Sequence, residues 1–473
     1  MPDDASLTGF PSLAGRCDPP SSGLRIAVVG AGIAGLSAAW LLAKRHRVTL
    51  FEAAPSLGGH SNTVDVAPAG GQGGSIAVDT GFLVFNERTY PNLISLFRQL
   101  GVATEASDMS FSVSVADGKF EYAGASKLRG LFAQGSNVVS PRFWALLGEI
   151  LRYYRAHRGR GADAGLEHVS LRQLLDAGGY SEDFRKLHLL PMAAAIWSGT
   201  MDSLLDYPAA SFLRFCDNHG LLQVARRPRW RTVTGGSRRY VQAMAASMAC
   251  VVHTATPVTS ILRAAGQTRL FTERFGWQGF DHVVVAAHGD QALRMLADAD
   301  GRERAILGAF AYQPNRAVLH RDPALMPVRK AAWASWNYLA DWNDQGNPDA
   351  GSPVSVTYWL NRLQNLPANS PLFLSLNPLR EPQPDLVERR FAYEHPQFDL
   401  AALNAQRRLD DIQGVRGTWF CGSYCGHGFH EDALRAGIAV ARALGADVPW
   451  TTDVAPAGST SARARALEWA RAA

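Results

Sequence analysis

Arg25-Ile-Ala-Val-Val-Gly30-Ala-Gly32-Ile-Ala-Gly35 is the stretch of sequence that decides the predicted fold. A short run typical of a buried strand leads directly into a Gly-x-Gly-x-x-Gly turn, and residues 36–44 continue with the pattern of a helix. A second strand-like run, residues 47–51, ends at Glu52. This order of strand, glycine turn, helix, strand and acid predicts a dinucleotide-binding βαβ unit.

Each glycine of the turn has its own mechanical role in such a unit. Gly30 permits the tight turn, Gly32 lets a pyrophosphate approach the backbone, and Gly35 lets helix and strand pack closely. The phosphates are expected at the N-terminus of the helix. Glu52 stands where a carboxylate can bind the two hydroxyls of a ribose and would repel a 2′-phosphate. The unit alone leaves open whether the nucleotide is NAD or FAD.

Composition narrows the class of protein. The chain has 473 residues, 47 Lys and Arg against 42 Asp and Glu, and five cysteines. Its length suits about two to three domains. Because the charges are spread along the chain, we predict no nucleic-acid partner. The few scattered cysteines predict a reducing compartment, the cytoplasm. Residues 26–43 are the only long apolar run, and since glycines interrupt it we predict no transmembrane helix.

The residues after Glu52 carry a more specific pattern. A double-glycine loop, Gly58-Gly59-His60-Ser-Asn-Thr63, is followed by Val78-Asp-Thr-Gly81-Phe82 and by residues 86–92. On these motifs the chain resembles the flavin amine oxidase, phytoene desaturase and protoporphyrinogen oxidase superfamily, and within it a bacterial branch of predicted NAD/FAD-binding proteins. The resemblance spans residues 24–444 and implies FAD as the cofactor. His60 stands where the superfamily usually has Arg.

Two later segments are expected to complete the FAD site. Residues 253–261 alternate like a strand, and residues 280–287 form an apolar run typical of a buried strand. The resemblance implies that Val258 contacts the adenine and that Ala286 lies beside the cofactor. Residues 417–437 predict a strand, a glycine-rich loop and the start of a helix at 431–444. The resemblance places the N-terminus of this helix at the pyrimidine edge of the flavin, where its dipole favours negative charge.

The fingerprint and the resemblance together assign one set of residues to FAD. Most relatives carry an acid at the position of Ser423, whose hydroxyl can still donate or accept a hydrogen bond. The full set is Gly30, Gly32, Ile33, Ala34, Gly35, Glu52, Ala53, Gly58, Gly59, His60, Gly81, Phe82, Val258, Ala286, Gly422, Ser423, Glu431, Asp432 and Ala433.

The same C-terminal loop contains a cluster that resembles a metal site. Cys421, Cys425, His427 and His430 have side chains that suit zinc, but their spacing differs from that of paired zinc ligands. We therefore predict no metal. A covalent bond from Cys421 or Cys425 to the flavin is a further chemical possibility.

The predicted fold class is α/β, with a Rossmann-like FAD-binding domain of the glutathione-reductase type and an inserted α+β substrate domain. The FAD-binding domain is assigned to residues 25–87, 231–304 and 406–447, and the substrate domain to residues 88–230 and 305–405. Residues 90–100, 143–155 and 171–177 predict helices, whereas residues 316–320, 331–338, 353–360 and 372–376 predict strands. Residues 1–24 predict a disordered leader. Residues 448–473 predict a tail whose short basic helix could contact a membrane surface.

Aromatic residues gather in the predicted substrate domain and suit a large apolar ligand better than a small polar one. They are Trp197, Trp230, Trp333, Trp336, Tyr338, Tyr358 and Trp359. We therefore predict an FAD-dependent oxidoreductase that takes a hydride from a C–H bond of an apolar, lipid-like substrate, fatty acyl or polyene, at the junction of the two domains. His430 and Tyr424 are the candidates for moving a proton or shaping the pocket.

The sequence leaves three other functions open. A flavin amine oxidase would use a lysine near the flavin, for which Lys330 is the candidate. An isomerase or mutase would use the reduced flavin without net oxidation, and a flavin-carrying binding protein would have no turnover. The sequence does not predict the oligomeric state.

Overall fold

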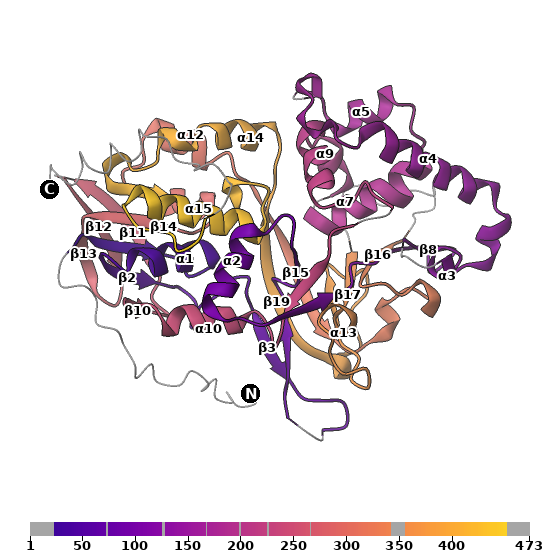
Figure 1. Ribbon diagram of the computed structural model, residues 1–473, viewed down its shortest axis with the longest axis horizontal. Helices are drawn as coiled ribbons and strands as arrows, with labels where there is room; N and C mark the ends of the chain where they lie inside the picture. The colour runs from indigo at the N-terminus through magenta and orange to yellow at the C-terminus, as the bar shows by residue number, and fades with distance from the viewer. Residues whose placement is uncertain are drawn as a thin grey trace.

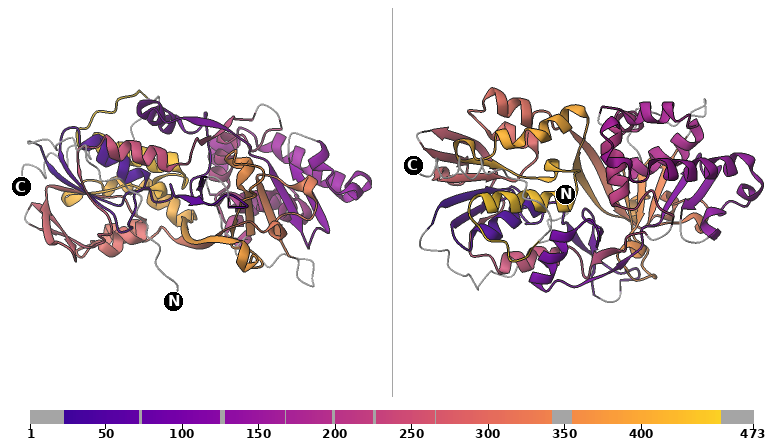
Figure 2. Two further views of the ribbon diagram at one scale, coloured as in Figure 1. Left: turned by 90° about the horizontal axis from the view of Figure 1, so that it is seen from below. Right: turned by 45° about the horizontal axis from the view of Figure 1, so that its top comes forward.

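The computed structural model describes residues 23–451, except 72–73, 125–127, 167, 198–199, 225–226, 265 and 342–354. Most of the predicted leader, with Cys17, and the predicted basic helix of the tail lie outside the described residues. The described part forms two lobes that lie side by side (Figure 1), and Figure 2 shows them from two further directions. None of the described helices combines the length and the apolar character needed to cross a membrane.

A five-stranded parallel sheet is the centre of the first lobe. Its strand order is β10-β2-β1-β14-β20. The ranges are Arg25–Val29 (β1), Arg47–Phe51 (β2), Val251–His253 (β10), His282–Val285 (β14) and Thr418–Phe420 (β20). Three distant parts of the chain therefore share one sheet, and the middle strand β1 is buried from Ile26 to Val29 because both its edges and both its faces are covered.

Two layers cover this sheet. On one face α1 (Ile33–Leu42) packs along α15 (His430–Ala443), so closely that a Cβ atom on Gly437 would lie 2.2 Å from the carbonyl oxygen of Ala34. Helix α10 (Arg238–Ala246) packs against α1, and α2 (Pro91–Leu100) packs against α15. The other face carries a three-stranded antiparallel sheet of β11 (Val258–Ala264), β12 (Gln267–Thr272) and β13 (Gly276–Phe280).

The single strand predicted at residues 253–261 is two strands in the structure. Strand β10 ends at His253 and β11 begins at Val258. Between them Ala255 has a φ angle of 46°, in the left-handed region, and Pro257 lacks the N–H group that a sheet ladder requires. The chain therefore turns from one sheet to the other at this point.

A seven-stranded sheet is the centre of the second lobe, in the order β19-β15-β18-β17-β16-β7-β8. The pairing is antiparallel except between β16 and β7. The ranges are Phe111–Val115 (β7), Phe120–Gly124 (β8), Tyr312–His320 (β15), Trp336–Ala340 (β16), Ser355–Trp359 (β17), Phe373–Leu376 (β18) and Val387–Pro396 (β19). The long strands β15 and β19 run along the junction of the lobes (Figure 1).

Helices from residues 128–218 pack beside this sheet. They are α3 (Leu128–Leu131), α4 (Pro141–His157), α5 (Leu171–Ala177), α6 (Glu182–Phe184), α7 (Leu190–Trp197), α8 (Met201–Leu205) and α9 (Ala209–Asn218). The helices predicted at residues 90–100, 143–155 and 171–177 are present as α2, α4 and α5, but the prediction overlooks β7 and β8, although Phe111, Val113 and Val115 alternate as strand residues do. The strand predicted from residue 331 begins at Trp336, since Lys330–Ala332 forms a 3₁₀ turn.

Smaller elements connect the lobes. Strands β3 (Thr63–Val66) and β4 (Ile76–Asp79) form a hairpin, and β5 (Phe85–Asn86), β9 (Trp230–Val233) and β6 (Thr104–Ser107) form a three-stranded sheet. The remaining helices are α11 (Gly289–Met295), α12 (Gly301–Leu307), α13 (Leu360–Leu363) and α14 (Leu400–Arg407).

Candidate functional site

A cavity of about 770 Å³ lies between the two lobes. Its walls come from the carboxyl ends of the parallel strands in the first lobe and from the seven-stranded sheet and helices of the second. A site of this size, at the end of a parallel sheet and between lobes, is typical of cofactor binding.

The turn between β1 and α1 forms one wall of the cavity. Gly30 has a φ angle of 98°, and a Cβ atom there would lie 2.5 Å from the carbonyl oxygen of Ala286. At Gly35 a Cβ atom would lie 1.9 Å from the carbonyl oxygen of Gly30. A Cβ atom on Gly32, in contrast, meets no protein atom within 4 Å. The fold itself therefore requires Gly30 and Gly35, whereas Gly32 leaves space for whatever enters the cavity.

Glu52 closes this turn at the end of β2. Its Oε2 atom accepts a hydrogen bond from the backbone N–H of Ala31 at 2.6 Å, and its Oε1 atom accepts one from Ala54 at 2.8 Å. Each carboxylate oxygen can accept a second hydrogen bond. The carboxylate lines the cavity and is held rigidly, as the binding of a ribose hydroxyl pair requires.

The double-glycine loop lies against the same turn. The N–H of Gly58 donates to the carbonyl oxygen of Ala31 at 2.9 Å, and a Cβ atom on Gly59 would lie 3.1 Å from the Cα of Gly32. The carbonyl oxygen of His60 accepts from the N–H of Phe82 at 2.7 Å. Residues 58–60 and 81–82, which the resemblance assigned together, are thus neighbours in the structure.

His60 presents an unsatisfied polar atom at the cavity. Burial and the neighbouring histidines lower the pKa of this side chain to about 3, so the ring is neutral. Its Nε2 atom is buried and has no hydrogen-bond partner among the described residues. A buried polar atom without a partner costs free energy that a bound ligand can restore. The open space at Gly32, the carboxylate of Glu52 and this atom together fit an extended dinucleotide.

Most of the residues predicted to bind the cofactor line this one cavity. These are Gly30, Gly32, Ile33, Ala34, Glu52, Ala53, Gly58, Gly59, His60, Gly81, Phe82, Val258, Ala286, Gly422, Ser423 and Ala433. Gly35, Glu431 and Asp432 do not line it. Gly35 lies behind the turn, in the packing role predicted for it.

The side chains of Glu431 and Asp432 are bound outside the cavity, and the predicted place of these residues beside the flavin stays a prediction. Glu431 accepts hydrogen bonds from the backbone N–H groups of Asn92 and Leu93, at 2.9 and 3.0 Å, and so holds the N-terminus of α2. Asp432 accepts from the N–H groups of His427 and Phe429, at 3.0 and 3.1 Å. Backbone donors at a helix N-terminus and in a tight loop attract carboxylates, and here they bind both.

Glu431 leads to a prediction about stability and pH. Burial raises the pKa of this carboxyl from 4.5 to about 7. The folded chain therefore keeps the proton to higher pH than the unfolded chain does, and the stability from this group is present below about pH 4.5 and lost as the pH rises through 7. The full shift corresponds to about 3 kcal/mol. Glu431→Gln, which resembles the protonated carboxyl, should therefore unfold with a smaller stability difference between pH 5 and pH 8 than the wild type.

Urea denaturation of both proteins at the two pH values measures this difference. The exposed Glu273→Gln, in the hairpin of β12 and β13, is the matched control and should follow the wild type. Equal pH dependence in the wild type and Glu431→Gln would contradict the prediction.

The two candidate catalytic residues also line the cavity. The Nε2 atom of His430 lies 2.7 Å from the hydroxyl of Tyr240 and 3.3 Å from that of Ser61, and its ring stacks on Phe82 at 3.9 Å between centroids. Burial lowers the pKa of His430 to about 3. This histidine is therefore neutral and fixed in place, which favours shaping the pocket over accepting a proton at neutral pH.

Tyr424 has a different environment. Burial raises the pKa of its phenol well above the usual value, and its hydroxyl has no hydrogen-bond partner among the described residues. Its ring packs at 4.8 Å from that of Phe310 and lies against Gly422, where a Cβ atom would come within 2.7 Å of it. Tyr424 thus shapes the glycine-rich loop beside the cavity.

The seven-stranded sheet forms the apolar wall. Trp336, Tyr358 and Leu374 are paired across β16, β17 and β18 and all line the cavity. Of the aromatic residues singled out in the sequence, Trp197 and Trp230 also line it, whereas Trp333, Tyr338 and Trp359 do not. Trp359 directly follows Tyr358 on β17 and therefore lies on the opposite face, whereas Tyr338 shares the face of Trp336 further along β16, and Trp333 lies before that strand.

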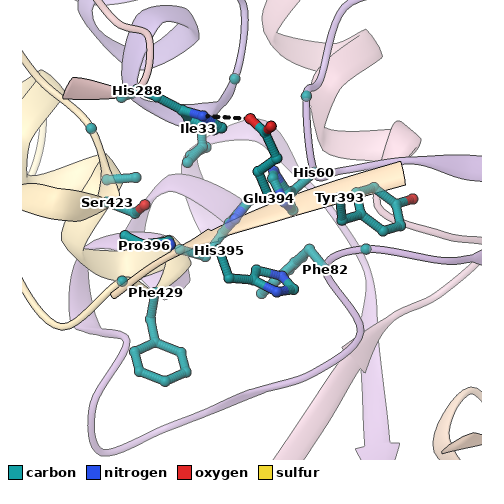
Figure 3. A pocket seen from close by; sticks show the side chains of 18 of the residues that line it. Ile33, His60, Phe82, His288, Tyr393, Glu394, His395, Pro396, Ser423 and Phe429 are labelled. Atoms are coloured by element: carbon teal, nitrogen blue, oxygen red, sulfur yellow. Dashed lines mark ion pairs between the residues drawn. The ribbon is translucent and has the colours of Figure 1, made fainter. Parts of the chain in front are cut away.

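Strand β19 contributes side chains that the sequence reasoning missed. Figure 3 shows Tyr393, Glu394, His395 and Pro396 crossing the site near His60 and Phe82. The carboxylate of Glu394 lies 3.3 Å from Nδ1 of His288, and the two form an ion pair only when His288 is protonated, which burial disfavours by lowering its pKa. The alternating character of residues 387–396 is a sequence signal that could have revealed the strand, although not its place beside the cavity.

Lys330 and the cluster of cysteines and histidines are the two other features that the sequence singled out. Lys330 is exposed and does not line the cavity, and neither does any other lysine of the described residues. Within the described ranges, no group of histidines, cysteines and acids could hold a metal ion. Cys421 is fully buried in the core.

Comparison with known proteins adds the family context. The model of the family described as flavin containing amine oxidoreductase matches residues 33–445. Carotenoid phi-ring synthase from Streptomyces griseus is 35% identical over 146 residues, which are 30% of this chain and 27% of that protein. The match with that relative therefore spans about a quarter of its length.

Solved structures resemble the whole described fold. The CLA-producing fatty acid isomerase from P. acnes has 16% identity and a TM-score of 0.60, covering 89% of this chain and 98% of that one. Cyclohexylamine oxidase from Brevibacterium oxydans has 17% identity and a TM-score of 0.63, covering 89% and 99%. At these identities the likeness shows the fold alone, and it confirms the predicted fold class.

Proposed function

The chain belongs to the flavin containing amine oxidoreductase family and is an FAD-dependent oxidoreductase, and we propose that its substrate is an apolar, lipid-like molecule from which a hydride is removed at a C–H bond. Fatty acyl chains and polyenes are the two forms of substrate that this proposal includes. The observation that carries it is the character of the cavity walls in the second lobe, which are mainly aromatic and aliphatic apart from His219, Glu394 and His395, and which contain no lysine among the described residues.

FAD fits the cavity through three separated segments of the chain. We assign the pyrophosphate to the open space at Gly32 and the N-terminus of α1, and the adenosine ribose to Glu52. Val258 would contact the adenine, and the loop at Gly422 and Ser423 the ribityl chain. A bound flavin supplies the redox chemistry as the acceptor of a hydride. The protein residues then have to hold the substrate, exclude water and stabilise charge.

The walls of the second lobe are suited to holding an apolar chain. Trp336 and Tyr358 pack edge to face at 4.9 Å, and Leu374 continues the same surface. An apolar substrate transferred from water to such walls gains about 25 cal/mol for each Å² of apolar surface that is buried. The same walls keep water from the site of hydride transfer.

Few charged side chains of the described residues line the cavity, and none of them is a lysine of the kind that an amine oxidase would use. Glu52 is bound to the backbone of the turn, and the carboxylate of Glu394 lies 3.3 Å from Nδ1 of His288, whose pKa burial lowers. Arg294 is the other charged residue of the described chain that lines the cavity, and it forms an ion pair with Asp290 at 2.7 Å. Lys330, the lysine proposed for an amine oxidase, is on the surface.

Two of the three related proteins have names that support an apolar substrate, and one does not. One relative is named for a carotenoid ring and one fold relative for a fatty acid, whereas another is named as an amine oxidase. The isomerase alternative keeps its support from the fatty acid isomerase, whose fold is shared.

Anaerobic mixing of the FAD-loaded protein with candidate substrates tests the proposal. We expect linoleic acid, its coenzyme A ester or lycopene to bleach the flavin absorbance, and cyclohexylamine and putrescine to leave it unchanged. Bleaching by the amines alone would favour an amine oxidase. Conversion of the fatty acid only after prior reduction of the flavin would favour an isomerase.

Trp336→Ala is predicted to weaken substrate use while leaving FAD in place. Removing a large aromatic ring from an apolar wall costs binding free energy that corresponds to a rise in KM of about tenfold or more. Steady-state kinetics with the substrate that bleaches the flavin, together with the FAD content, provide the measurement. Lys330→Ala is the matched control and should retain both. Unchanged kinetics in Trp336→Ala, or lost activity in Lys330→Ala, would contradict the proposed substrate.

A further inference from the structure

His395 lies on β19 where that strand crosses the cavity (Figure 3). Its ring lines the cavity and lies 5.6 Å from the ring of His60, on the double-glycine loop. The ring nitrogen Nδ1 forms a hydrogen bond with Asn315, whereas the other ring nitrogen, Nε2, has no hydrogen bond to the described chain. The hydrogen bond at Nδ1 therefore decides whether Nε2 of His395 can donate a hydrogen bond to a ligand or accept one from it.

The hydrogen bonds that lead from Asn377 through Asn315 to His395 have a fixed direction from donor to acceptor. It begins at Asn377, whose Oδ1 atom accepts a hydrogen bond from the backbone N–H of Arg316 at 2.9 Å. Because a backbone N–H can only donate, this contact fixes the orientation of the Asn377 amide, with its oxygen facing the N–H of Arg316. The NH₂ group of Asn377 then faces Asn315 and donates to its Oδ1 atom at 2.7 Å.

Asn315 in turn donates a hydrogen bond to His395. Its Nδ2 atom donates to the carbonyl oxygen of Gln313 at 2.9 Å, which independently assigns nitrogen to this side of the amide. The same Nδ2 atom lies 3.1 Å from Nδ1 of His395. An amide NH₂ group can only donate, so Nδ1 of His395 must accept.

The protonation of the histidine follows from this contact. A neutral imidazole whose Nδ1 accepts carries its proton on Nε2. Burial and the nearby His288 lower the pKa of His395 to about 4, so the ring is neutral at pH 7. Asn315 is itself buried, with 2% of its surface exposed, and cannot reorient to water.

We propose that Asn377 and Asn315 hold His395 as a fixed Nε2–H donor, and that this donor binds a hydrogen-bond acceptor in the cavity, a ring nitrogen or carbonyl oxygen of the flavin or a carbonyl oxygen of the substrate. The flavin form concerns the cofactor site alone, whereas the substrate form rests on the proposed function. Asn315 and Asn377 are positioning residues, and His395 is the residue that contacts the ligand.

A donor fixed in this way serves an oxidation that leaves negative charge on an acceptor. The donor is aligned before the reaction, so no reorganisation is needed as charge develops. A neutral donor also stabilises a neutral or anionic acceptor without bringing a positive charge into an apolar cavity. A cationic ammonium group has no acceptor to offer, and the same donor would disfavour it.

The tautomer of His395 is the first test. In FAD-bound protein labelled with ¹⁵N-histidine, long-range ¹H–¹⁵N spectra at pH 7 should show His395 neutral with its proton on Nε2, the signals being assigned by their absence in His395→Phe. Asn315→Asp replaces the donor by a carboxylate that only accepts. It should move the proton to Nδ1 or charge the ring. Asn365→Asp, an exposed asparagine outside the cavity, should leave the His395 signals unchanged.

The absorption spectrum and midpoint potential of bound FAD, without substrate, form the second test. If the acceptor is on the flavin, His395→Phe and Asn315→Asp should both shift them. If it is on the substrate, the free holoenzyme should keep its spectrum and potential while KM for the acyl substrate rises about tenfold or more. This second arm requires that the proposed substrate be correct, whereas the tautomer and the flavin spectrum do not.

Three results would overturn the inference. They are a wild-type His395 with its proton on Nδ1 or with a charged ring, an unchanged tautomer in Asn315→Asp, and a His395→Phe variant that matches the wild type in flavin spectrum, potential and KM. If His395→Phe fails to fold, Asn315→Asp still decides between the outcomes, with the ¹⁵N signals of His395 recognised as those that this variant displaces.

Discussion

Gly32→Ala is expected to yield a folded protein that has lost most of its affinity for FAD. Gly32 has φ and ψ angles of −68° and 178°, which any residue adopts, and a Cβ atom there meets no protein atom within 4 Å. The free energy of unfolding of the apoprotein should therefore stay within about 0.5 kcal/mol of the wild type. The added methyl group would occupy the space that we assign to the pyrophosphate, so the Kd for FAD should rise by about a hundredfold or more.

Titration of the apoprotein with FAD, followed by quenching of flavin fluorescence, measures this change, and urea denaturation of the apoprotein checks the fold. A Gly32→Ala protein that binds FAD as the wild type does would show that the phosphates lie elsewhere. A loss of stability in the apoprotein would show that the effect is not on the cofactor.

Gly35→Ala, one helical turn further along, should have the opposite effect. The added methyl group would lie 1.9 Å from the carbonyl oxygen of Gly30 and 3.0 Å from the Cβ of Ala286. The turn cannot move away freely, because the N–H of Gly30 is bonded to the carbonyl oxygen of Phe51. Helix α1 must therefore separate from β1, and we expect the free energy of unfolding to fall by about 3 kcal/mol.

Urea denaturation of the two apoproteins side by side provides the comparison. The same methyl group is added in both variants, so the difference between their free energies of unfolding reports only the effect of its position in the turn. An apoprotein of Gly35→Ala with the midpoint of the wild type would contradict the close packing of helix and strand.

The first βαβ unit could be predicted from sequence nearly to the residue. Strand β1 begins at Arg25 and β2 ends at Phe51 as expected, and α15 runs from His430 where 431 was predicted. In these elements the local pattern and the tertiary contacts agree, because glycine turns, a buried strand and an amphipathic helix each leave their own signature. The first helix begins at Ile33, earlier than predicted, since Gly35 is already helical.

The second lobe was harder to predict because its strands pair over long distances. Strand β7 joins β16 across more than two hundred residues, and nothing near Phe111 in the sequence announces that partner. A short alternating run within a mostly helical region is ambiguous until a partner strand is known. Strand β19, with Tyr393 and His395, was not predicted for the same reason.

The candidate site shows which kinds of residue a motif can place. Gly30 and Gly32 of the turn and Glu52 lie at the cavity as expected, because their positions depend on backbone geometry that the motif itself specifies. The side chains of Glu431 and Asp432 do not line the cavity and instead accept hydrogen bonds from backbone N–H groups of α2 and of the loop before α15. Those donors come from tertiary packing and from loop conformation, which the motif does not specify.

We infer that three distant segments of one chain hold a single FAD in the cavity between the lobes. The most direct measurement is the amount of flavin in the purified protein, from its visible absorption spectrum and from the FAD released by heating. We predict a yellow protein with about one FAD per chain, and loss of that FAD in Gly32→Ala. A colourless protein that takes up no FAD when it is supplied in excess would contradict the account.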